Sequence, residues 1–154
     1  YGDFQCPACG AYYPLVKKLL EEYGDKIEFT YRHFPLSQHA QADLAARASE
    51  AARRQGKFVE MYDWLYVNQE HWANQSDARD KFVSYAQILS LDLDKFQQDL
   101  DNQEIETKIK SEYQEGVQRG VSGTPTFFLN GRKLTANPRS YDEFKQLIDR
   151  ALQD

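Results

Sequence analysis

Two cysteines, Cys6 and Cys9, are the only thiols in the 154-residue chain, and Pro7 and Ala8 separate them. A pair with this spacing can bind a metal, form a structural crosslink or take part in a redox reaction. In the first turn of a helix, residues i and i+3 lie on one side, at a Cα separation that a disulfide tolerates. The chemistry of the pair therefore depends on the segment that carries it.

A metal site and an inert crosslink both fit this pair poorly. Structural zinc requires four ligands, commonly two Cys-x-x-Cys pairs or one pair with two spaced histidines. The chain has one pair, and His33, His39 and His71 lack the spacing of finger ligands, so we expect no metal. A disulfide across three residues closes too small a loop to remove much entropy from the unfolded chain.

A redox role has positive physical support. Residues from Cys6 to Tyr23 predict a helix, with Pro7 at a favourable first position. The free N–H groups and the dipole at a helix N-terminus stabilise an anion, lower a thiol pKa and so make the corresponding disulfide a better oxidant. We predict that Cys6 is the exposed attacking sulfur and that Cys9, one turn later, is the shielded sulfur that resolves a mixed disulfide.

Pro7 and Ala8 should tune this pair. Pro7 has no N–H to offer the thiolate, and Ala8 offers only its backbone N–H. We therefore expect a thiolate stabilised mainly by the helix and the backbone. Its pKa should stay above about 4, less extreme than with a basic residue at position 8.

The elements that must position the cysteines begin with a strand. Ile27–Phe34 alternates in a pattern of period two and is followed by Pro35. A second strand ahead of the cysteines would have little room in Tyr1–Phe4, so we expect most of it, and any export signal or anchor, to lie ahead of Tyr1.

The rest of the chain changes from helical to strand-like near its end. From about His39 to Gly120 the pattern is helical. Thr126–Leu129 then predicts a short strand and Asn130-Gly131 a hairpin turn. A last helix is expected from Tyr141 to Leu152, capped by Ser140. A parallel pair joined by a helix, followed by an antiparallel hairpin, makes a small mixed sheet, and the central helices should form a cap beside it.

Charge and hydropathy narrow the range of partners. The net charge is −5, with both signs mixed along the chain, which argues against nucleic acid and against an anionic membrane surface. No window approaches the roughly 18 apolar residues of a membrane span.

Four features, in this order, resemble the DsbA-like thiol–disulfide oxidoreductases of the thioredoxin superfamily. They are the Cys-Pro-Ala-Cys pair at a helix start, a proline within that helix, a Gly-Thr-Pro-Thr loop before the hairpin, and the helical insertion: Cys6–Cys9, Pro14, Gly123–Thr126 and residues 39–103. The resemblance implies an α/β, thioredoxin-like fold, a mixed central sheet flanked by helices, from residues 1–38 and 104–154, with 39–103 as an all-helical insertion domain.

The resemblance also assigns roles to Thr124 and Pro125. Taken alone, Pro125 predicts a trans turn, because cis X–Pro bonds are uncommon. The resemblance implies instead that the Thr124–Pro125 bond is cis and that Pro125 packs against the sulfurs. It further implies that the backbone of Thr124 pairs with an extended substrate segment, and it places the Thr124 hydroxyl where it can tune the sulfurs.

The resemblance implies an enzyme that forms disulfides in exported bacterial proteins, in the periplasm or another extracytoplasmic compartment. Its partners would be cysteine-containing proteins or peptides and a redox partner that resets the pair. The Cys6–Cys9 disulfide would itself be the redox centre, so no dissociable cofactor is expected. Two alternatives stay open, a disulfide reductase or isomerase and a non-catalytic binding or chaperone module on the same fold. A third, a glutathione-conjugating relative with a similar insertion, would need a glutathione pocket that the sequence does not show. The Pro-Ala dipeptide differs from the Pro-His of the best-known DsbA proteins, which leaves the strength of the oxidant open.

Overall fold

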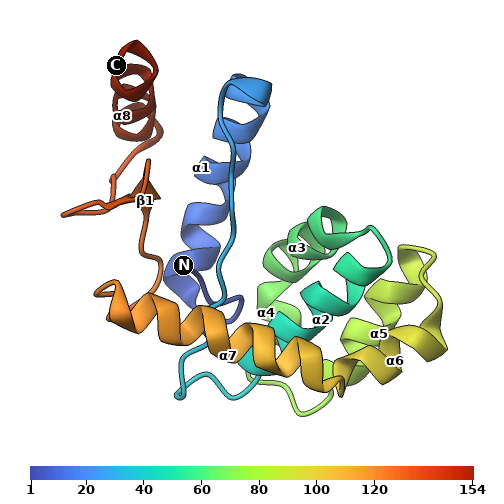
Figure 1. The fold of residues 1–154 in the computed structure, drawn as a ribbon. Helices are drawn as coiled ribbons and strands as arrows, with labels where there is room; N and C mark the ends of the chain where they lie inside the picture. Colours follow the sequence, from blue (N-terminus) through green and yellow to red (C-terminus); the bar gives the residue numbers. More distant parts are fainter.

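The computed structural model describes residues 1–154 and is mostly helical, with one small sheet (Figure 1). The elements in chain order are α1 (Pro7–Tyr23), a 3₁₀ turn (Gly24–Lys26), α2 (Ala42–Arg54), α3 (Phe58–Val67), α4 (Gln69–Trp72), α5 (Ala78–Ile88), α6 (Leu93–Leu100), α7 (Gln103–Gln118), β1 (Phe128–Leu129), β2 (Arg132–Lys133) and α8 (Tyr141–Gln153). None of these helices combines the length and apolar character needed to cross a membrane.

Helices α2 to α6 gather on one side of the molecule, and α1, β1 and α8 lie on the other (Figure 1). Helix α2 is central to the helical side and contacts α3, α5, α6 and α7. Its small side chains let these neighbours approach closely, and six of its alanines are at most 2% exposed: Ala42, Ala45, Ala46, Ala48, Ala51 and Ala52.

Helix α7 runs along the base and connects the two sides (Figure 1). It passes close to Phe34 at Gly116, where a Cβ atom would lie only 2.8 Å from the Phe34 ring. A glycine is therefore required for this contact. Tyr113, one turn earlier on α7, stacks on the same ring with a centroid distance of 4.3 Å.

The cysteine segment is anchored in the larger of two hydrophobic clusters. That cluster contains Phe4, Cys6 and Cys9 together with buried side chains of the helical block. It therefore extends across the predicted boundary between residues 1–38 and the insertion. A smaller cluster joins α1 to α8 through four side chains: Leu19, Tyr23, Phe144 and Ile148.

The sheet differs from the prediction. β1 pairs antiparallel with β2, with Phe128 opposite Lys133, around the Asn130-Gly131 turn, where both residues have positive φ. The predicted strand Ile27–Phe34 is extended but pairs only through an isolated parallel bridge between Gly2 and His33. The prediction of a complete strand is wrong because alternation shows which side chains can face a core, whereas a strand also needs a partner along its length.

The predicted helices are confirmed, including two details of their ends. Ser140 caps α8, because its hydroxyl accepts a 3.2 Å hydrogen bond from the backbone N–H of Glu143. Pro14 lies inside α1, and Gly24 follows the last residue of that helix with φ of 50°. Gly24 thus has a positive φ, which a glycine adopts without steric cost.

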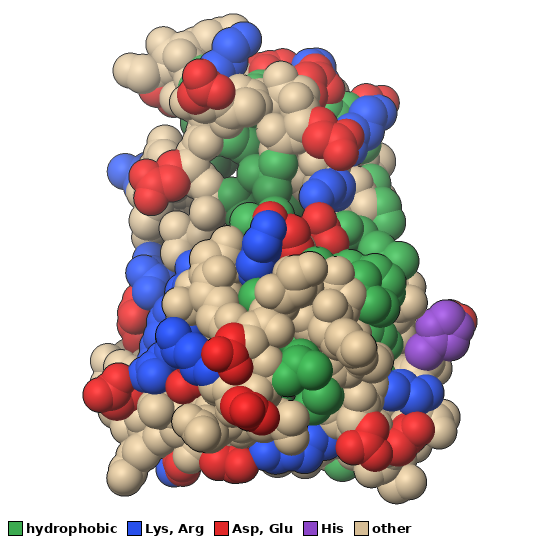
Figure 2. Space-filling view, turned by 90° about the vertical axis from the view of Figure 1, so that its right-hand side faces the viewer, with side chains coloured by type: hydrophobic (Ala, Val, Ile, Leu, Met, Phe, Trp, Pro, Cys, Tyr) green, Lys and Arg blue, Asp and Glu red, His purple; other side chains and the backbone are tan.

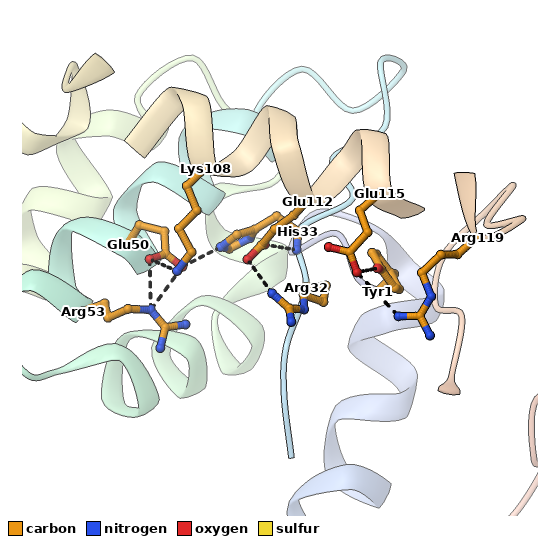
Figure 3. Close-up of polar contacts among 9 residues, drawn as sticks. All are labelled: Tyr1, Arg32, His33, Glu50, Arg53, Lys108, Glu112, Glu115 and Arg119. Atoms are coloured by element: carbon orange, nitrogen blue, oxygen red, sulfur yellow. Dashed lines mark hydrogen bonds and ion pairs between the residues drawn. The ribbon is translucent and has the colours of Figure 1, made fainter. Parts of the chain in front are cut away.

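A buried ionic network connects α2, α7 and the extended segment (Figure 3). The carboxylate of Glu50 lies 2.8 Å from Nε2 of His33 and accepts 2.9 Å bonds from Arg53 and Lys108. His33 is 1% exposed, as expected for a core histidine, and its backbone N–H donates to Glu112 at 2.7 Å. These ion pairs and hydrogen bonds connect α2 and α7 to the extended segment Ile27–Phe34.

Candidate active site

Cys6 occupies the N-cap position of α1, and Pro7 begins the helix. The backbone N–H of Cys6 donates to the carbonyl of Asp3 at 3.1 Å, and its carbonyl accepts from Gly10 at 3.1 Å. Cys9 follows one turn later, and both cysteines are free thiols in the structure. The first helical turn therefore fixes the backbone geometry of the pair.

The loop before β1 faces the cysteines from 118 positions further along the chain. Sγ of Cys6 lies 3.6 Å from the carbonyl oxygen of Thr124, to which it donates a hydrogen bond. The Thr124–Pro125 peptide bond is cis. Pro125 and Cys9 line the same groove. The structure thus brings Cys6, Cys9, Thr124 and Pro125 into one site.

The surroundings of Cys6 favour its thiolate. Together these surroundings lower the pKa of Cys6 to about 5, and the largest cause is a hydrogen bond from the side chain of Cys9 to the sulfur. Burial opposes this shift, while the Thr124 hydroxyl and the backbone N–H groups of Cys9 and Ala8 add to it. The prediction that the helix and the backbone are the main stabilisers of the thiolate is wrong, because the Cys9 thiol and the Thr124 hydroxyl both contribute more than the backbone N–H groups.

Cys9 has the opposite tendency. Its hydrogen bond to the Cys6 thiolate raises the pKa of the Cys9 thiol, and burial raises it further. The predicted contrast in exposure is wrong, because Cys6 is only 6% exposed and Cys9 4%. The cysteines differ instead in proton affinity, since one turn of helix and one loop direct donors toward Cys6. Pro7 and Ala8 are exposed between them.

The side-chain hydroxyl of Thr124 lacks a hydrogen-bond partner. Its Oγ1 is buried and has no hydrogen-bond partner while both cysteines are thiols. A buried hydroxyl without a partner is unfavourable, and a thiolate is a strong acceptor for it. The hydroxyl is therefore positioned to stabilise Cys6 once the proton has left.

Asp3 organises the backbone beneath the cysteines. Its carboxylate is buried and accepts hydrogen bonds from the backbone N–H of Gln5 at 2.7 Å and of Leu36 at 2.9 Å. Its Oδ2 also lies 2.7 Å from Nδ1 of His39. The sequence left the role of Asp3 open and gave no reason to connect it with His39, 36 positions away. The structure shows that it holds the turn into α1.

Gln69, the first residue of α4, holds the same turn from the helical block. Its side-chain amide donates to the carbonyl of Phe4 at 2.7 Å and to that of Cys6 at 2.9 Å. The carbonyl of Phe4 has no other hydrogen bond in the structure. Gly10 gives the amide room, since a Cβ atom there would lie 2.5 Å from Gln69 Oε1. Sequence spacing gave no sign of this contact.

Tyrosines surround the inner side of the pair. The hydroxyls of Tyr31 and Tyr66 share a 2.8 Å hydrogen bond, and burial raises the pKa of both phenols. Both residues line the groove that reaches Cys9. They stay neutral and give Cys9 a largely apolar environment. No group of three or more His, Cys, Asp or Glu side chains is placed to hold a metal ion.

Comparison with known proteins agrees with this geometry. The family model described as Thioredoxin matches residues 1–150. A thioredoxin-like oxidoreductase from Silicibacter pomeroyi superposes with a TM-score of 0.80 at 25% identity, covering 99% of this chain and 83% of that one. BdbD from Bacillus subtilis shares the fold with a TM-score of 0.83 at 20% identity, covering 100% and 85%.

The curated relatives are much longer proteins. A Na(+)/H(+) antiporter NhaA 1 from Salinispora arenicola is 42% identical over 135 residues, which are 86% of this chain and 20% of that protein. The NhaA antiporter of Herminiimonas arsenicoxydans is 34% identical over 142 residues, or 92% and 21%. The chain thus spans about a fifth of the length of these relatives. From the family match over nearly its whole length, the chain belongs to the thioredoxin family.

Proposed function

We propose that the chain catalyses thiol–disulfide exchange with protein substrates through Cys6 and Cys9. The observation that carries this proposal is the opposite shift in proton affinity of two thiols one helical turn apart, with a pKa of about 5 at Cys6 and a raised pKa at Cys9. The thiolate is the nucleophile and leaving group in such exchange. The site thus separates an ionised, attacking sulfur from a protonated, resolving one.

In the oxidising direction, a substrate thiolate attacks Sγ of Cys6 in the Cys6–Cys9 disulfide. The intramolecular S–S bond breaks, and Cys9 leaves as a thiolate that takes up a proton because of its raised pKa. A second substrate thiolate then attacks the substrate sulfur of the mixed disulfide, and Cys6 leaves as a thiolate. Two electrons pass from the substrate to the pair, which is the redox centre without any dissociable cofactor.

The lowered pKa of Cys6 supports oxidation as the favoured direction. At neutral pH a thiol with a pKa of about 5 is almost fully ionised. A stabilised thiolate favours the reduced pair and therefore makes the disulfide a stronger oxidant. Reduction or isomerisation of substrate disulfides is the alternative, since the same two sulfurs can run the exchange in reverse.

The loop at Thr124 and Pro125 offers a binding place for an extended substrate segment. The backbone N–H of Thr124 makes no hydrogen bond within the chain, and its carbonyl contacts the sulfur of Cys6. A substrate strand pairing with Thr124 would bring its own cysteine to Cys6, in the manner of strand addition. A cysteine-containing protein or peptide fits this arrangement.

Equilibration with defined glutathione mixtures tests the direction. We expect a potential closer to about −120 mV than to about −270 mV, the values typical of a strong oxidant and a reductant respectively. A value near the reductant would favour the alternative direction. If Cys6→Ser retained the cellular function of the native chain, that function would not depend on thiol exchange. The result would then favour a binding or chaperone module.

The cellular setting is a separate proposal. Oxidation of exported proteins requires an extracytoplasmic location and a partner that reoxidises the pair. The antiporter relatives favour a second setting, in which a thiol–disulfide module is carried by a membrane transporter. An immunoblot of fractionated cells distinguishes them: a small product in the periplasmic fraction supports the first setting, and a much larger membrane-bound product supports the second.

A further inference from the structure

The loop ahead of α2 holds the residues that lead into the cysteines. Within this loop, the N–H of His39 donates to the carbonyl of Leu36 at 3.1 Å, which closes a tight turn. Two groups of that turn contact the same carboxylate oxygen of Asp3, the N–H of Leu36 at 2.9 Å and Nδ1 of His39 at 2.7 Å. Further along the loop, the N–H of Gln41 donates to the side chain of Gln5 at 2.7 Å. These contacts join the loop to the turn into α1.

Asp3 connects this loop to both cysteines. Its carbonyl accepts the backbone N–H of Cys6 at 3.1 Å. The bond to Cys6 and burial raise the pKa of the Cys9 thiol, and the largest contribution that opposes them is a hydrogen bond from the backbone N–H of Asp3. That N–H bonds to no oxygen of the chain. Because the Asp3 side chain is 0% exposed and accepts three hydrogen bonds, it fixes the backbone that carries this N–H.

Cys9 must carry a negative charge during part of the proposed reaction. It leaves as a thiolate when a substrate thiolate attacks Cys6 in the disulfide, and in the reverse step its thiolate attacks Cys6 in the mixed disulfide. Once Cys6 is bonded to a substrate sulfur it is uncharged, so it no longer accepts the Cys9 proton in a hydrogen bond. The donors left for the Cys9 thiolate are the backbone N–H of Asp3 and the Thr124 hydroxyl, and Asp3 contributes more.

His39 is the part of this arrangement that reaches solvent. A carboxylate can only accept hydrogen bonds, so Nδ1 of His39 carries a proton and donates it to Asp3. Nε2 of His39 has no partner within the chain and is open to water, since the side chain is 19% exposed. The backbone bonds of His39 to Leu36 and Ala42 do not involve its side chain. Replacing the imidazole therefore removes one contact, the bond to Asp3.

We propose that His39 is a positioning residue for the steps in which Cys9 attacks or leaves, because it holds the Asp3 carboxylate and so keeps the backbone N–H of Asp3 directed at the Cys9 sulfur. The inference rests on the proposed thiol–disulfide exchange and adds a residue to it. In the resolving step Cys9 gives its proton to water, and its thiolate supplies the electron pair for the new bond to Sγ of Cys6. The bond from Cys6 to the substrate sulfur breaks, and the substrate leaves as a thiolate.

The loop of His39 acts on the cysteine turn from a separate part of the molecule. It lies at the base of the molecule in Figure 1, whereas Figure 2 shows an apolar recess in the upper half. None of residues 35–41 lines the groove that reaches Cys9. The groups that lower the pKa of Cys6 also lie outside this loop. A change at His39 should therefore alter the reactivity of Cys9 and leave that of Cys6 as it is.

Stopped-flow reaction of the reduced chain with the aromatic disulfide dithiobis(nitrobenzoate) tests the proposal. Attack by Cys6 releases one coloured thiolate and leaves a mixed disulfide, and attack by Cys9 on that mixed disulfide releases a second. In His39→Leu we expect the second phase to slow by about threefold, because a thiol whose pKa rises by about one unit loses tenfold in thiolate and regains about threefold in nucleophilicity. The first phase should stay at the native rate. His39→Asn, whose side-chain N–H can replace Nδ1, should recover most of the second-phase rate.

The matched control is His71→Leu, which makes the same change at an exposed histidine and should leave both phases at the native rates. Three results would overturn the proposal: a native second phase in His39→Leu, equal slowing of both phases in that variant, and a second phase as slow in His39→Asn or His71→Leu as in His39→Leu. Release of only the first thiolate by the native chain would instead contradict the proposed exchange between the two cysteines. The failure of the inference and the failure of the proposed function are therefore distinguishable.

Discussion

Cys6 and Cys9 are the same side chain one helical turn apart, yet their surroundings give them opposite proton affinities. The Cys9 thiol, the Thr124 hydroxyl and two backbone N–H groups all favour charge on Cys6. When Cys6 is ionised, its charge and the burial of Cys9 hold the second proton in place. The pair thus carries one negative charge, which lies on Cys6, while Cys9 keeps its proton.

Removing the Thr124 hydroxyl should weaken this asymmetry. We predict that Thr124→Val raises the pKa of Cys6 by about one unit, because a hydrogen bond to a charged group is worth about 1.5 kcal/mol or more. The pH dependence of alkylation of Cys6 measures the shift. Thr135→Val makes the same chemical change at an exposed position and should leave the pKa of Cys6 unchanged. An equal shift in both variants would show that the Thr124 hydroxyl does not stabilise the Cys6 thiolate.

Adding a positive charge at position 8 should strengthen the asymmetry. Ala8 is exposed between the cysteines and contributes only its backbone. We predict that Ala8→His lowers the pKa of Cys6 below its value of about 5 and makes the redox potential less negative, because an imidazolium beside a thiolate favours the charged form. Ala11→His, one turn further along α1, is the control and should change the potential less. A potential that moved in the negative direction would contradict this reasoning.

The residues of the candidate site were predictable to the extent that they lie in local patterns. Cys6, Cys9, Pro7 and Ala8 form a continuous motif, and Thr124 with Pro125 forms another. Asp3, His39 and Gln69 were not assigned, because their roles depend on contacts across 36 to 65 positions. No spacing rule within one element connects residues so far apart.

At the scale of elements, α4 acts on the cysteines through Gln69. We predict that Gln69→Ala lowers the free energy of unfolding by about 1–2 kcal/mol, because the carbonyl of Phe4 would lose its only hydrogen bond. Urea unfolding measures the loss. Gln98→Ala, at an exposed position of α6, is the matched control, and an equal effect in both variants would mean that the contact with the cysteine turn contributes nothing.

The ionic network between α2, α7 and the extended segment should make stability depend on pH. Burial raises the pKa of Glu50, but hydrogen bonds from His33, Lys108 and Arg53 outweigh it and lower the pKa to about 2 from 4.5. The folded pKa is depressed, so this contribution to stability is complete above the unfolded pKa of 4.5 and is lost as the pH falls through about 2.

We therefore predict that Glu50→Gln reduces the dependence of the unfolding free energy on pH between 4.5 and 2. Urea unfolding at a series of pH values measures the slope. Glu21→Gln, at an exposed position, should retain the native slope. A native slope in Glu50→Gln would show that the network does not act as described.

Helices were predictable from the sequence because a helix satisfies most of its hydrogen bonds within itself. The conformation of the extended segment Ile27–Phe34 was only partly predictable from the sequence, because alternation does not indicate whether a neighbouring strand is present. The bridge between Gly2 and His33 is the one pairing that this segment makes in the structure. Sheet formation is the property that depended on segments distant in sequence.

For the molecule as a whole, the fold joins two halves of one site. The helical block holds the cysteine turn through Gln69 and the larger hydrophobic cluster. Helix α7 leads from that block to the loop of Thr124 and Pro125, which faces Cys6. Because Thr124 contacts the sulfur of Cys6, a substrate bound to Cys6 in the proposed reaction would lie beside this loop.

Trapping of a mixed disulfide tests the central claim most directly. Without the resolving thiol, Cys9→Ser should accumulate a covalent complex with a cysteine-containing peptide whose cysteine is activated as a disulfide, and mass spectrometry should locate the bond at Cys6. Cys6→Ser should give far less complex under the same conditions, because the raised pKa keeps the Cys9 thiol protonated. Equal trapping in both variants, or a bond at Cys9 in preference to Cys6, would contradict the account.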